Sequence, residues 1–280
     1  MPLFVTPDGV KLNYQIEGCG KPVLFLHGWA MCSRVWKYQV AHLAGAYQVI
    51  CPDLPGHGAS ECSSGTCDFA SLTRDIALFI NGLGLERVTL VGWSIGASVA
   101  ILLAASHRLP VDSLVLVDGT PSFMMRDDFP HGLPAPSLRR MLKLADKDFS
   151  RALKEFYGLL LSEHDQSLTS GDEIRDLLTN EQYLPRRDAA RALLASLARE
   201  DLRENLRSIS IPCLLLHGDQ DKICPLGAST YMKERLAQAE ITMFPGAGHA
   251  PFLTRADCFN DRLATFLCHY DRQEKNKAVI

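Results

Sequence analysis

The sequence predicts an α/β fold, a mostly parallel eight-stranded sheet with helices on both faces and an inserted helical segment. Three observations predict it. Short β-branched apolar segments alternate with amphipathic helical patterns along most of the 280 residues, as expected of crossover units around a parallel sheet. The alternation stops at Pro121 and resumes near Ile211, and the residues between carry helical patterns. The pentapeptide 92–96 connects a buried strand pattern to an apolar helix.

The opening part of the chain contains most of the alternation. An initial hairpin is expected, with strands at 3–6 and 11–17 and its turn at Pro7–Gly9. Strand patterns then cover 22–27, 47–51, 87–91 and 111–117, and helical patterns cover 34–45, 70–84 and 97–105.

The second part of the chain contains the break and the return of the sheet. Strands are expected at 211–217 and 241–244, with helices at 226–238 and 252–270. We therefore predict a catalytic domain made of residues 1–120 and 208–270. Residues 121–207 are predicted to form a helical lid inserted into it, and the polar residues 271–280 a disordered tail.

Composition excludes several classes of protein. A net charge of −3 and a pI near 6.3 argue against a nucleic-acid binder. The apolar runs are too short for a membrane span, and the first residues lack the pattern of a signal peptide. The nine cysteines are scattered, and the spacing of Cys62 and Cys67 is a weak signal, so free thiols in the cytoplasm are expected. We expect a monomer.

The pentapeptide Gly92-Trp93-Ser94-Ile95-Gly96 is the strongest functional motif. A Gly-x-Ser-x-Gly pattern is weak alone, but between a strand and a helix it forms a tight turn that presents the serine. The turn places Ser94 at the carboxyl edge of the sheet and at a helix N-terminus, whose partial positive charge favours developing anions. We predict Ser94 as a nucleophile.

A serine hydroxyl is a poor nucleophile unless an oriented base takes its proton. Two later strand ends supply the missing groups, because loops converge at the carboxyl edge of the sheet. His249 follows a glycine-rich loop after the strand 241–244 and is the predicted base. Asp219 and Asp221 compete for the acid, and Asp221 is favoured because Asp219 lies closer to the strand and suits a turn.

Backbone amides are expected to stabilise the oxyanion of a tetrahedral intermediate. The amide of Ile95 follows the nucleophile directly, and that of Trp29 lies in the loop after an early strand. Four other polar residues near strand ends are not assigned a catalytic role. Asp53 and Asp118 are interpreted as structural, and His57 as a residue that stabilises a turn. His217 lies too close to its own backbone to replace His249 as the base. No phosphate-binding loop or paired metal ligands are found in the sequence, so no cofactor and no metal are predicted.

Five segments together resemble the α/β-hydrolase superfamily across the whole predicted catalytic domain. They are His27-Gly28-Trp29, Asp53-Leu-Pro-Gly-His-Gly58, Gly92–Gly96, Gly218-Asp-Gln-Asp221 and Gly248-His-Ala-Pro-Phe252. Within that superfamily, Gly-Trp-Ser, His-Gly-Trp and the final His-Ala-Pro-Phe resemble the pimeloyl-[acyl-carrier protein] methyl ester esterases of biotin synthesis. The segments 121–130 and 148–156 of the insertion are also similar to that family.

The resemblance implies further site residues. In that family a phenylalanine of the lid begins a short run that lines the acyl pocket. Carried over to this chain, the substrate-binding residues are Phe156, Tyr157, Gly158, Leu159 and Leu160, beside Trp29, Ser94, Ile95 and His249. Arg151 becomes a contact for the carrier protein. Two departures are Ala97, where the family usually has glycine, and Glu155, where a basic residue is expected.

The charge of the lid supports a carrier partner on other grounds. Residues 137–160 hold six basic and three acidic residues, a local charge of +3 in a chain of net charge −3. The basic residues form one stripe if a single helix is continuous, whereas Asp146 could cap a second helix and divide it. The stripe is either a solvated helix face or a dock for acyl carrier protein, through Arg140, Lys143, Arg151 and Lys154.

These residues together predict a cytoplasmic serine carboxylesterase with a Ser94–Asp221–His249 triad. The resemblance implies the methyl ester of pimeloyl-acyl carrier protein as substrate. A general short-chain carboxylesterase and a carbon–carbon bond hydrolase are alternatives with the same triad. A ligand receptor built on this fold is the alternative outside enzymes.

Overall fold

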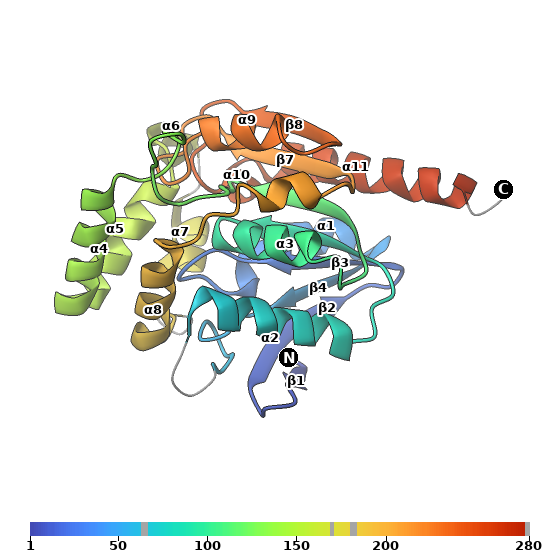
Figure 1. Ribbon diagram of the computed structural model, residues 1–280, viewed down its shortest axis with the longest axis horizontal. Coiled ribbons are helices and arrows are strands. Elements are labelled where there is room, and N and C mark those ends of the chain that lie inside the picture. The colour runs from blue at the N-terminus through green and yellow to red at the C-terminus, as the bar shows by residue number, and fades with distance from the viewer. Residues whose placement is uncertain (63–66, 169–170, 180–183, 278–280) are drawn as a thin grey trace.

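The computed structural model describes residues 1–62, 67–168, 171–179 and 184–277. One eight-stranded sheet forms its centre, in the spatial order β1-β2-β4-β3-β5-β6-β7-β8 (Figure 1). The strands are β1 (Leu3–Val5), β2 (Lys11–Glu17), β3 (Lys21–Leu26), β4 (Tyr47–Pro52), β5 (Val88–Trp93), β6 (Val111–Val117), β7 (Cys213–Gly218) and β8 (Ala239–Phe244).

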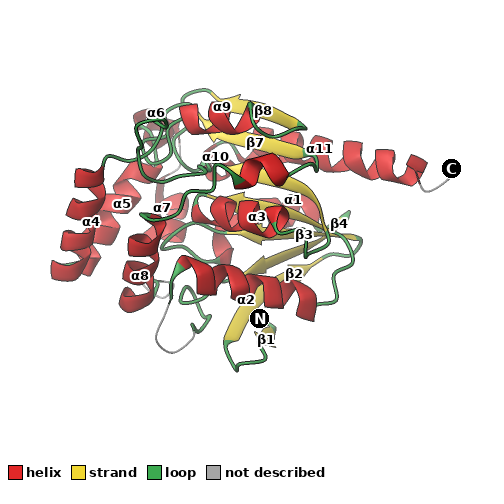
Figure 2. Ribbon diagram, viewed as in Figure 1, coloured by secondary structure: helices red, strands yellow, loops and turns green. Residues whose placement is uncertain are grey.

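The pairing of the strands confirms the predicted fold class. The hairpin strands β1 and β2 pair antiparallel, and β2 pairs antiparallel with β4. Every later pair, from β4·β3 to β7·β8, is parallel. All six residues of β5 are buried, as are all six of β7, because helices cover both faces of the sheet (Figure 2).

Two groups of helices sandwich the sheet. One group contains α2 (Phe69–Gly82) and α3 (Ile95–Ala105), which contact each other. The other contains α1 (Lys37–Leu43), α10 (Pro251–Thr254) and α11 (Ala256–Lys277). The expected helix over 34–45 begins as a 3-10 turn at Ser33–Trp36 before α1. α9 (Gly227–Lys233) contacts β7 and β8.

Local sequence explains where these helices begin and why they are buried. Asp68 caps α2, since its carboxylate accepts a hydrogen bond from the amide of Ser71 at 2.9 Å. α3 is apolar on all sides and almost wholly buried, which holds its first turn rigidly behind Ser94. Trp36 and Trp93 fill the core on the face covered by α10, where both rings pack on Phe252.

The described residues between β6 and β7 include five α-helices, which gather at one end of the sheet, at the left in Figure 1. They are α4 (Ala135–Lys147), α5 (Phe149–Leu160), α6 (Glu163–Leu168), α7 (Gly171–Thr179) and α8 (Arg187–Leu197). Of the two alternatives for residues 137–160, the divided one is confirmed, because α4 and α5 are separate helices. The second helix begins after Asp148, whose carboxylate accepts a hydrogen bond from the amide of Arg151 at 3.0 Å. The cap of this helix is therefore Asp148 and not Asp146.

Two other expectations need correction. The segment Asp271–Lys277, predicted to be disordered, continues α11, and Asp271 forms an ion pair with Lys21 at 2.8 Å. Residues 278–280 lie outside the described residues. Cys62 and Cys67 form a disulfide with Cα atoms 6.0 Å apart, whereas the other seven cysteines are free thiols as expected. Within the described segments, the structure contains no helix long and apolar enough to cross a bilayer.

Candidate active site

Ser94 occupies a strained turn between β5 and α3. Its backbone has φ 55° and ψ −116°, a conformation that side-chain-bearing residues rarely adopt. The glycines on either side are needed sterically, because a Cβ on Gly92 would lie 2.3 Å from the oxygen of Gly96. A Cβ on Gly96 would lie 2.2 Å from the carbonyl oxygen of Leu26. The turn therefore has the geometry that the pentapeptide predicts.

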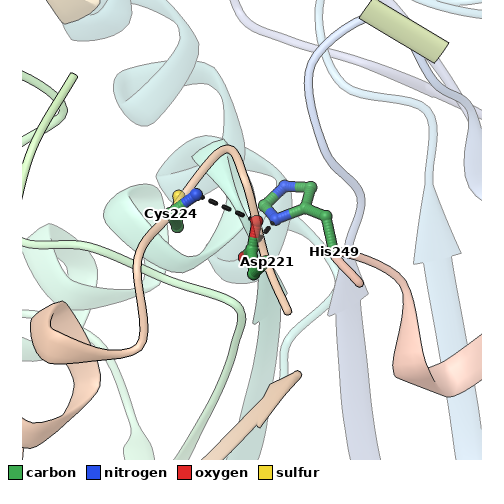
Figure 3. Close-up of side chains that lie close together, drawn as sticks. All are labelled: Asp221, Cys224 and His249. Carbon is green, nitrogen blue, oxygen red and sulfur yellow. Dashed lines mark hydrogen bonds and ion pairs between the residues drawn. The ribbon is translucent and has the colours of Figure 1, made fainter. Parts of the chain in front are cut away.

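A carboxylate and a histidine lie in the loops after β7 and β8, which are neighbours in the sheet. His249 Nδ1 lies 2.7 Å from Asp221 Oδ2, and both side chains are fully buried (Figure 3). The other oxygen, Asp221 Oδ1, accepts hydrogen bonds from the amides of Ile223 at 2.7 Å and Cys224 at 3.0 Å. These three bonds fix the carboxylate, and a proton on Nδ1 leaves Nε2 of His249 as the basic nitrogen.

His249 is held from two sides. Its carbonyl oxygen accepts a hydrogen bond from the indole of Trp93 at 2.7 Å. Its amide donates to the carbonyl oxygen of Leu160 at 2.8 Å. The nitrogen Nε2 is buried and has no hydrogen-bond partner within the described part of the chain, so it is available to a neighbouring hydroxyl.

Asp219 has a different position from Asp221. Its carboxylate is exposed and accepts a hydrogen bond from the amide of Gly246 at 2.8 Å. This bond ties the loop after β8, which leads to His249, to the loop after β7. Of the two candidate carboxylates, Asp221 is therefore the one that contacts the histidine, whereas Asp219 connects the two loops.

Asp118 and His217, which were not assigned a catalytic role in the sequence analysis, lie next to this pair. His217 Nε2 lies 3.5 Å from Asp221 Oδ2 and 3.8 Å from Asp118 Oδ1, and all three side chains are buried. Burial, and then the charge of Asp221, raise the pKa of Asp118 well above its ordinary value. β6 and β7 are adjacent in the sheet, so the positions of Asp118 and Asp221 at their carboxyl ends could have indicated this cluster.

Two groups of side chains here have the donor types of a metal site: Asp221 with Cys224 and His249, and Asp118 with His217 and Asp221. They do not fit a resident cation. Both ring nitrogens of His217 are engaged, Nδ1 with Ser229 Oγ and Nε2 with the carbonyl of Cys224, each at 2.7 Å. Burial raises the pKa of the Cys224 thiol, which disfavours the thiolate that binds metals.

Residues His27–Cys32 follow β3 and form the β3 loop. His27 Nε2 accepts a hydrogen bond from the amide of Leu54 at 2.8 Å, so the proton is on Nδ1, which donates to the carbonyl of Gly28 at 2.8 Å. Burial lowers the pKa of His27 to about 4, which keeps the ring neutral near pH 7. Since the carbonyl of Gly28 shares a peptide plane with the amide of Trp29, this bond fixes the direction of that amide.

Trp29, Ser94 and Ile95 share the wall of one cavity, in which the centre of a water molecule can occupy about 240 Å³. Ile95 is the first residue of α3, so its amide has no partner within the helix. The remaining lining residues are mainly apolar and come mostly from the helices between β6 and β7; among them are Phe123, Leu138, Met141, Leu194 and Leu197. The arrangement suits an acyl chain whose carbonyl lies at Ser94.

The run that the resemblance assigned to the acyl pocket divides into two sets. Phe156 and Leu159 line the cavity. Tyr157 and Leu160 are buried outside it, and Gly158 is exposed. The division follows from helix geometry, because one turn of α5 presents its side chains in all directions and only one face borders the cavity.

The four basic residues predicted to meet a carrier protein are all exposed, on α4 (Arg140 and Lys143) and α5 (Arg151 and Lys154). Glu155 lies between the two arginines, at 2.8 Å from Arg140 and 3.3 Å from Arg151. It therefore partly neutralises the surface at the position where the resemblance implies a basic residue.

Comparisons with known proteins show the family to which this chain belongs. A family model described as alpha/beta hydrolase fold matches residues 21–256. A pimeloyl-[acyl-carrier protein] methyl ester esterase of Nitrosomonas europaea is 36% identical over 251 residues, which cover 89% of this chain and 96% of the relative. Its counterpart in Nitrosospira multiformis is 32% identical, and the match covers 92% of this chain and 98% of the relative. The solved structure of an esterase from Exiguobacterium antarcticum has a TM-score of 0.86 at 26% identity, and the match covers 94% of this chain and 98% of that esterase.

Proposed function

The chain belongs to the α/β-hydrolase family, and from this premise we propose that it is a serine carboxylesterase of biotin synthesis. Its substrate is the methyl ester of a pimeloyl group carried on acyl carrier protein, as the names of its relatives suggest. We place the enzyme in the cytoplasm as a monomer, with residues 121–207 as a lid on the domain of 1–120 and 208–270. The observation that carries the proposal is the 2.7 Å bond between Asp221 and His249, and the strained turn at Ser94 supports it.

The first half of the reaction acylates the enzyme. His249 Nε2 accepts the proton of Ser94 as its oxygen attacks the ester carbonyl, and Asp221 stabilises the imidazolium through Nδ1. The amides of Trp29 and Ile95 donate to the carbonyl oxygen as it becomes negative. The intermediate collapses when the C–O bond to the methoxy group breaks, and His249 gives its proton to that oxygen, so that methanol leaves.

The second half regenerates the enzyme with the same groups. His249 takes a proton from water as the water oxygen attacks the acyl-serine carbonyl, and the same amides stabilise the second oxyanion. The bond to Ser94 then breaks, and the serine oxygen recovers its proton from His249. The products are a free carboxylate on the acyl chain and methanol, and no cofactor takes part in either step.

The cavity and the basic residues support the choice of substrate. Apolar side chains such as Phe156, Leu138 and Leu197 can bury the methylene chain of a pimeloyl group, with its methyl ester at Ser94. We propose that the other end of the chain leaves the cavity beside α4 and α5, which supply part of its lining. Exposed cations on these helices, Lys143 and Lys154 among them, can attract an acidic carrier protein.

One observation favours a second candidate function. Glu155 pairs with both Arg140 and Arg151 and reduces the positive charge available to a carrier. A short-chain carboxylesterase that acts on free esters needs the same triad and cavity but no such surface. This candidate differs from the first only in whether the acyl group arrives on a protein.

Steady-state hydrolysis of three esters tests the proposal. The substrates are methyl pimeloyl-acyl carrier protein, free dimethyl pimelate and p-nitrophenyl butyrate, each assayed by release of the alcohol. The proposal predicts the highest kcat/KM for the carrier-bound ester, mainly through a lower KM. Equal values for carrier-bound and free methyl esters favour the short-chain esterase. Absence of turnover on all three contradicts an esterase and favours a carbon–carbon bond hydrolase or a receptor.

A further inference from the structure

Helix α5 touches both loops that carry the proposed catalytic groups. The hydroxyl of Tyr157 donates a hydrogen bond to the carbonyl oxygen of Ala30 in the β3 loop, at 3.1 Å. One turn later, the carbonyl oxygen of Leu160 accepts the amide of His249, at 2.8 Å. Within one helical turn, therefore, α5 is bonded to the segment after Trp29 and to the proposed base.

Ala30 needs external support in the conformation it has. Its φ of +59° lies in the left-handed region, where a Cβ approaches the neighbouring carbonyl, and the residue is an alanine and not a glycine. Residues keep such strain only where the surrounding structure determines their conformation. The hydrogen bond from Tyr157 is made to the carbonyl of this strained residue, two peptide units beyond the amide of Trp29.

Two more contacts join the β3 loop to the helices between β6 and β7. The indole Nε1 of Trp29 donates to the carbonyl oxygen of Ala190 in α8 at 2.8 Å. The ring of Trp29 meets the ring of Phe156 edge to face, with centroids 4.8 Å apart. Trp29 itself is 4% exposed, so these contacts form in a closed interior where hydrogen bonds are strong.

The hydroxyl of Tyr157 acts as a hydrogen-bond donor and takes no part in proton transfer. Tyr157 is 9% exposed and does not line the large cavity. Burial, followed by the nearby Cys32, raises the pKa of its phenol above the ordinary value, so that it remains a donor. The sequence suggested it as part of the acyl pocket, but its hydroxyl contacts backbone and cannot contact the acyl chain.

We propose that Tyr157 is a positioning residue, which holds the β3 loop so that the amide of Trp29 is aimed at the developing oxyanion. The inference rests on the proposed esterase function. It makes the inserted helices part of the catalytic support as well as a cover for the acyl chain, because the bond to Ala30 and the bond to His249 come from the same helix. A donor that shifts loses more of its interaction with the transition state than with the substrate.

The direct test is Tyr157→Phe, which removes the hydroxyl and keeps the ring. Hydrolysis of p-nitrophenyl butyrate gives kcat and KM, and an alkyl trifluoromethyl ketone serves as a probe that forms a tetrahedral oxyanion on the serine. We expect kcat to fall about tenfold, the effect of weakening one buried hydrogen bond that supports an oxyanion donor, with KM within about twofold. The inhibition constant of the ketone should rise by the same factor as kcat falls.

A matched control is Tyr14→Phe. Tyr14 lies in β2, near the opposite edge of the sheet, and its ring packs on Phe79, so this variant loses the same hydroxyl far from the site. Its kinetics and ketone affinity should equal those of the unmodified protein. The thermal midpoint of each variant verifies folding. If Tyr157→Phe does not fold, Trp29→Phe removes the bond to Ala190 from the same loop and should weaken ketone binding in the same direction.

The outcomes separate this inference from the proposed function. Unchanged kcat and ketone affinity in folded Tyr157→Phe, or in Trp29→Phe if that variant is used, overturns the inference while the esterase stands. A rise in KM alone also overturns it, because it places the hydroxyl in ground-state binding. Failure of the unmodified protein to cleave any ester overturns both. A fall in kcat matched by weaker ketone binding supports the inference.

Discussion

Ser94, Asp221 and His249 follow three separate strands of the sheet, β5, β7 and β8. A strained turn needs small neighbours, so Gly92 and Gly96 mark Ser94 before any contact is known. For the carboxylate, distance from the strand favours Asp221 over Asp219. The structure gives the reason: Asp221 reaches the ring of His249, whereas Asp219 binds the amide of Gly246.

Other residues near the site could not be predicted from local pattern. The bond from Tyr157 to Ala30 joins residues 127 positions apart, and no spacing or periodicity indicates it. The position of Asp118 beside Asp221 depends on β6 and β7 being neighbours, and the sequence suggested only that Asp118 ends a strand. Local rules identify residue types and turns, whereas these contacts depend on packing.

At the residue scale, the two carboxylates can be tested against each other. Asp221→Asn removes the anion that orients His249 and stabilises its charged form, so kcat should fall by about 10⁴-fold. Asp219→Asn keeps a side-chain oxygen that can accept from Gly246, so kcat should change by less than about tenfold. Both are measured with p-nitrophenyl butyrate. The opposite ranking of the two variants would move the acid to Asp219.

The sequence predicts the positions of buried strands well, because burial determines their apolar pattern. It predicts the ends of helices less well. The apolar strands β5, β6 and β7 have the expected places because buried parallel strands read as apolar runs. The break between α4 and α5 was harder to place, because Asp146 and Asp148 are both possible caps. The structure selects Asp148, which bonds to the amide of Arg151. Polarity alone suggested a disordered tail, but α11 continues through those residues to Lys277.

At the element scale, the charges on α4 and α5 can be tested as a group. Replacing the four exposed basic residues by alanine should raise KM for methyl pimeloyl-acyl carrier protein; they are Arg140, Lys143, Arg151 and Lys154. The increase should shrink as salt rises, given a screening length of about 8 Å at physiological ionic strength. Hydrolysis of p-nitrophenyl butyrate should barely change.

Glu155→Gln is the counterpart of the alanine variant, because it increases the positive charge of the same surface. It releases Arg140 and Arg151 from their shared partner, so KM for the carrier-bound ester should fall while the small ester is unaffected. If the alanine variant loses activity equally on both esters, the helices are damaged. If neither set of changes affects the carrier-bound ester, the basic residues form a solvated surface and not a dock.

At the scale of the whole molecule, the sheet brings distant parts of the chain to one edge. Parallel strands β3, β5, β6, β7 and β8 all point their carboxyl ends toward the inserted helices, at the left in Figure 1. The alternation of strands and helices predicts this convergence. It does not predict that the inserted helices bond to the β3 loop and to the loop of His249, which makes the site a product of both parts of the chain.

Rapid-quench mass spectrometry with methyl pimeloyl-acyl carrier protein tests the central claim most directly. The unmodified protein should release methanol and carry a pimeloyl-carrier adduct on the peptide that contains Ser94. Ser94→Ala should fold normally, form no adduct and lose turnover on the order of 10⁴-fold or more. An adduct on another residue, or most of the turnover retained in Ser94→Ala, would contradict the account.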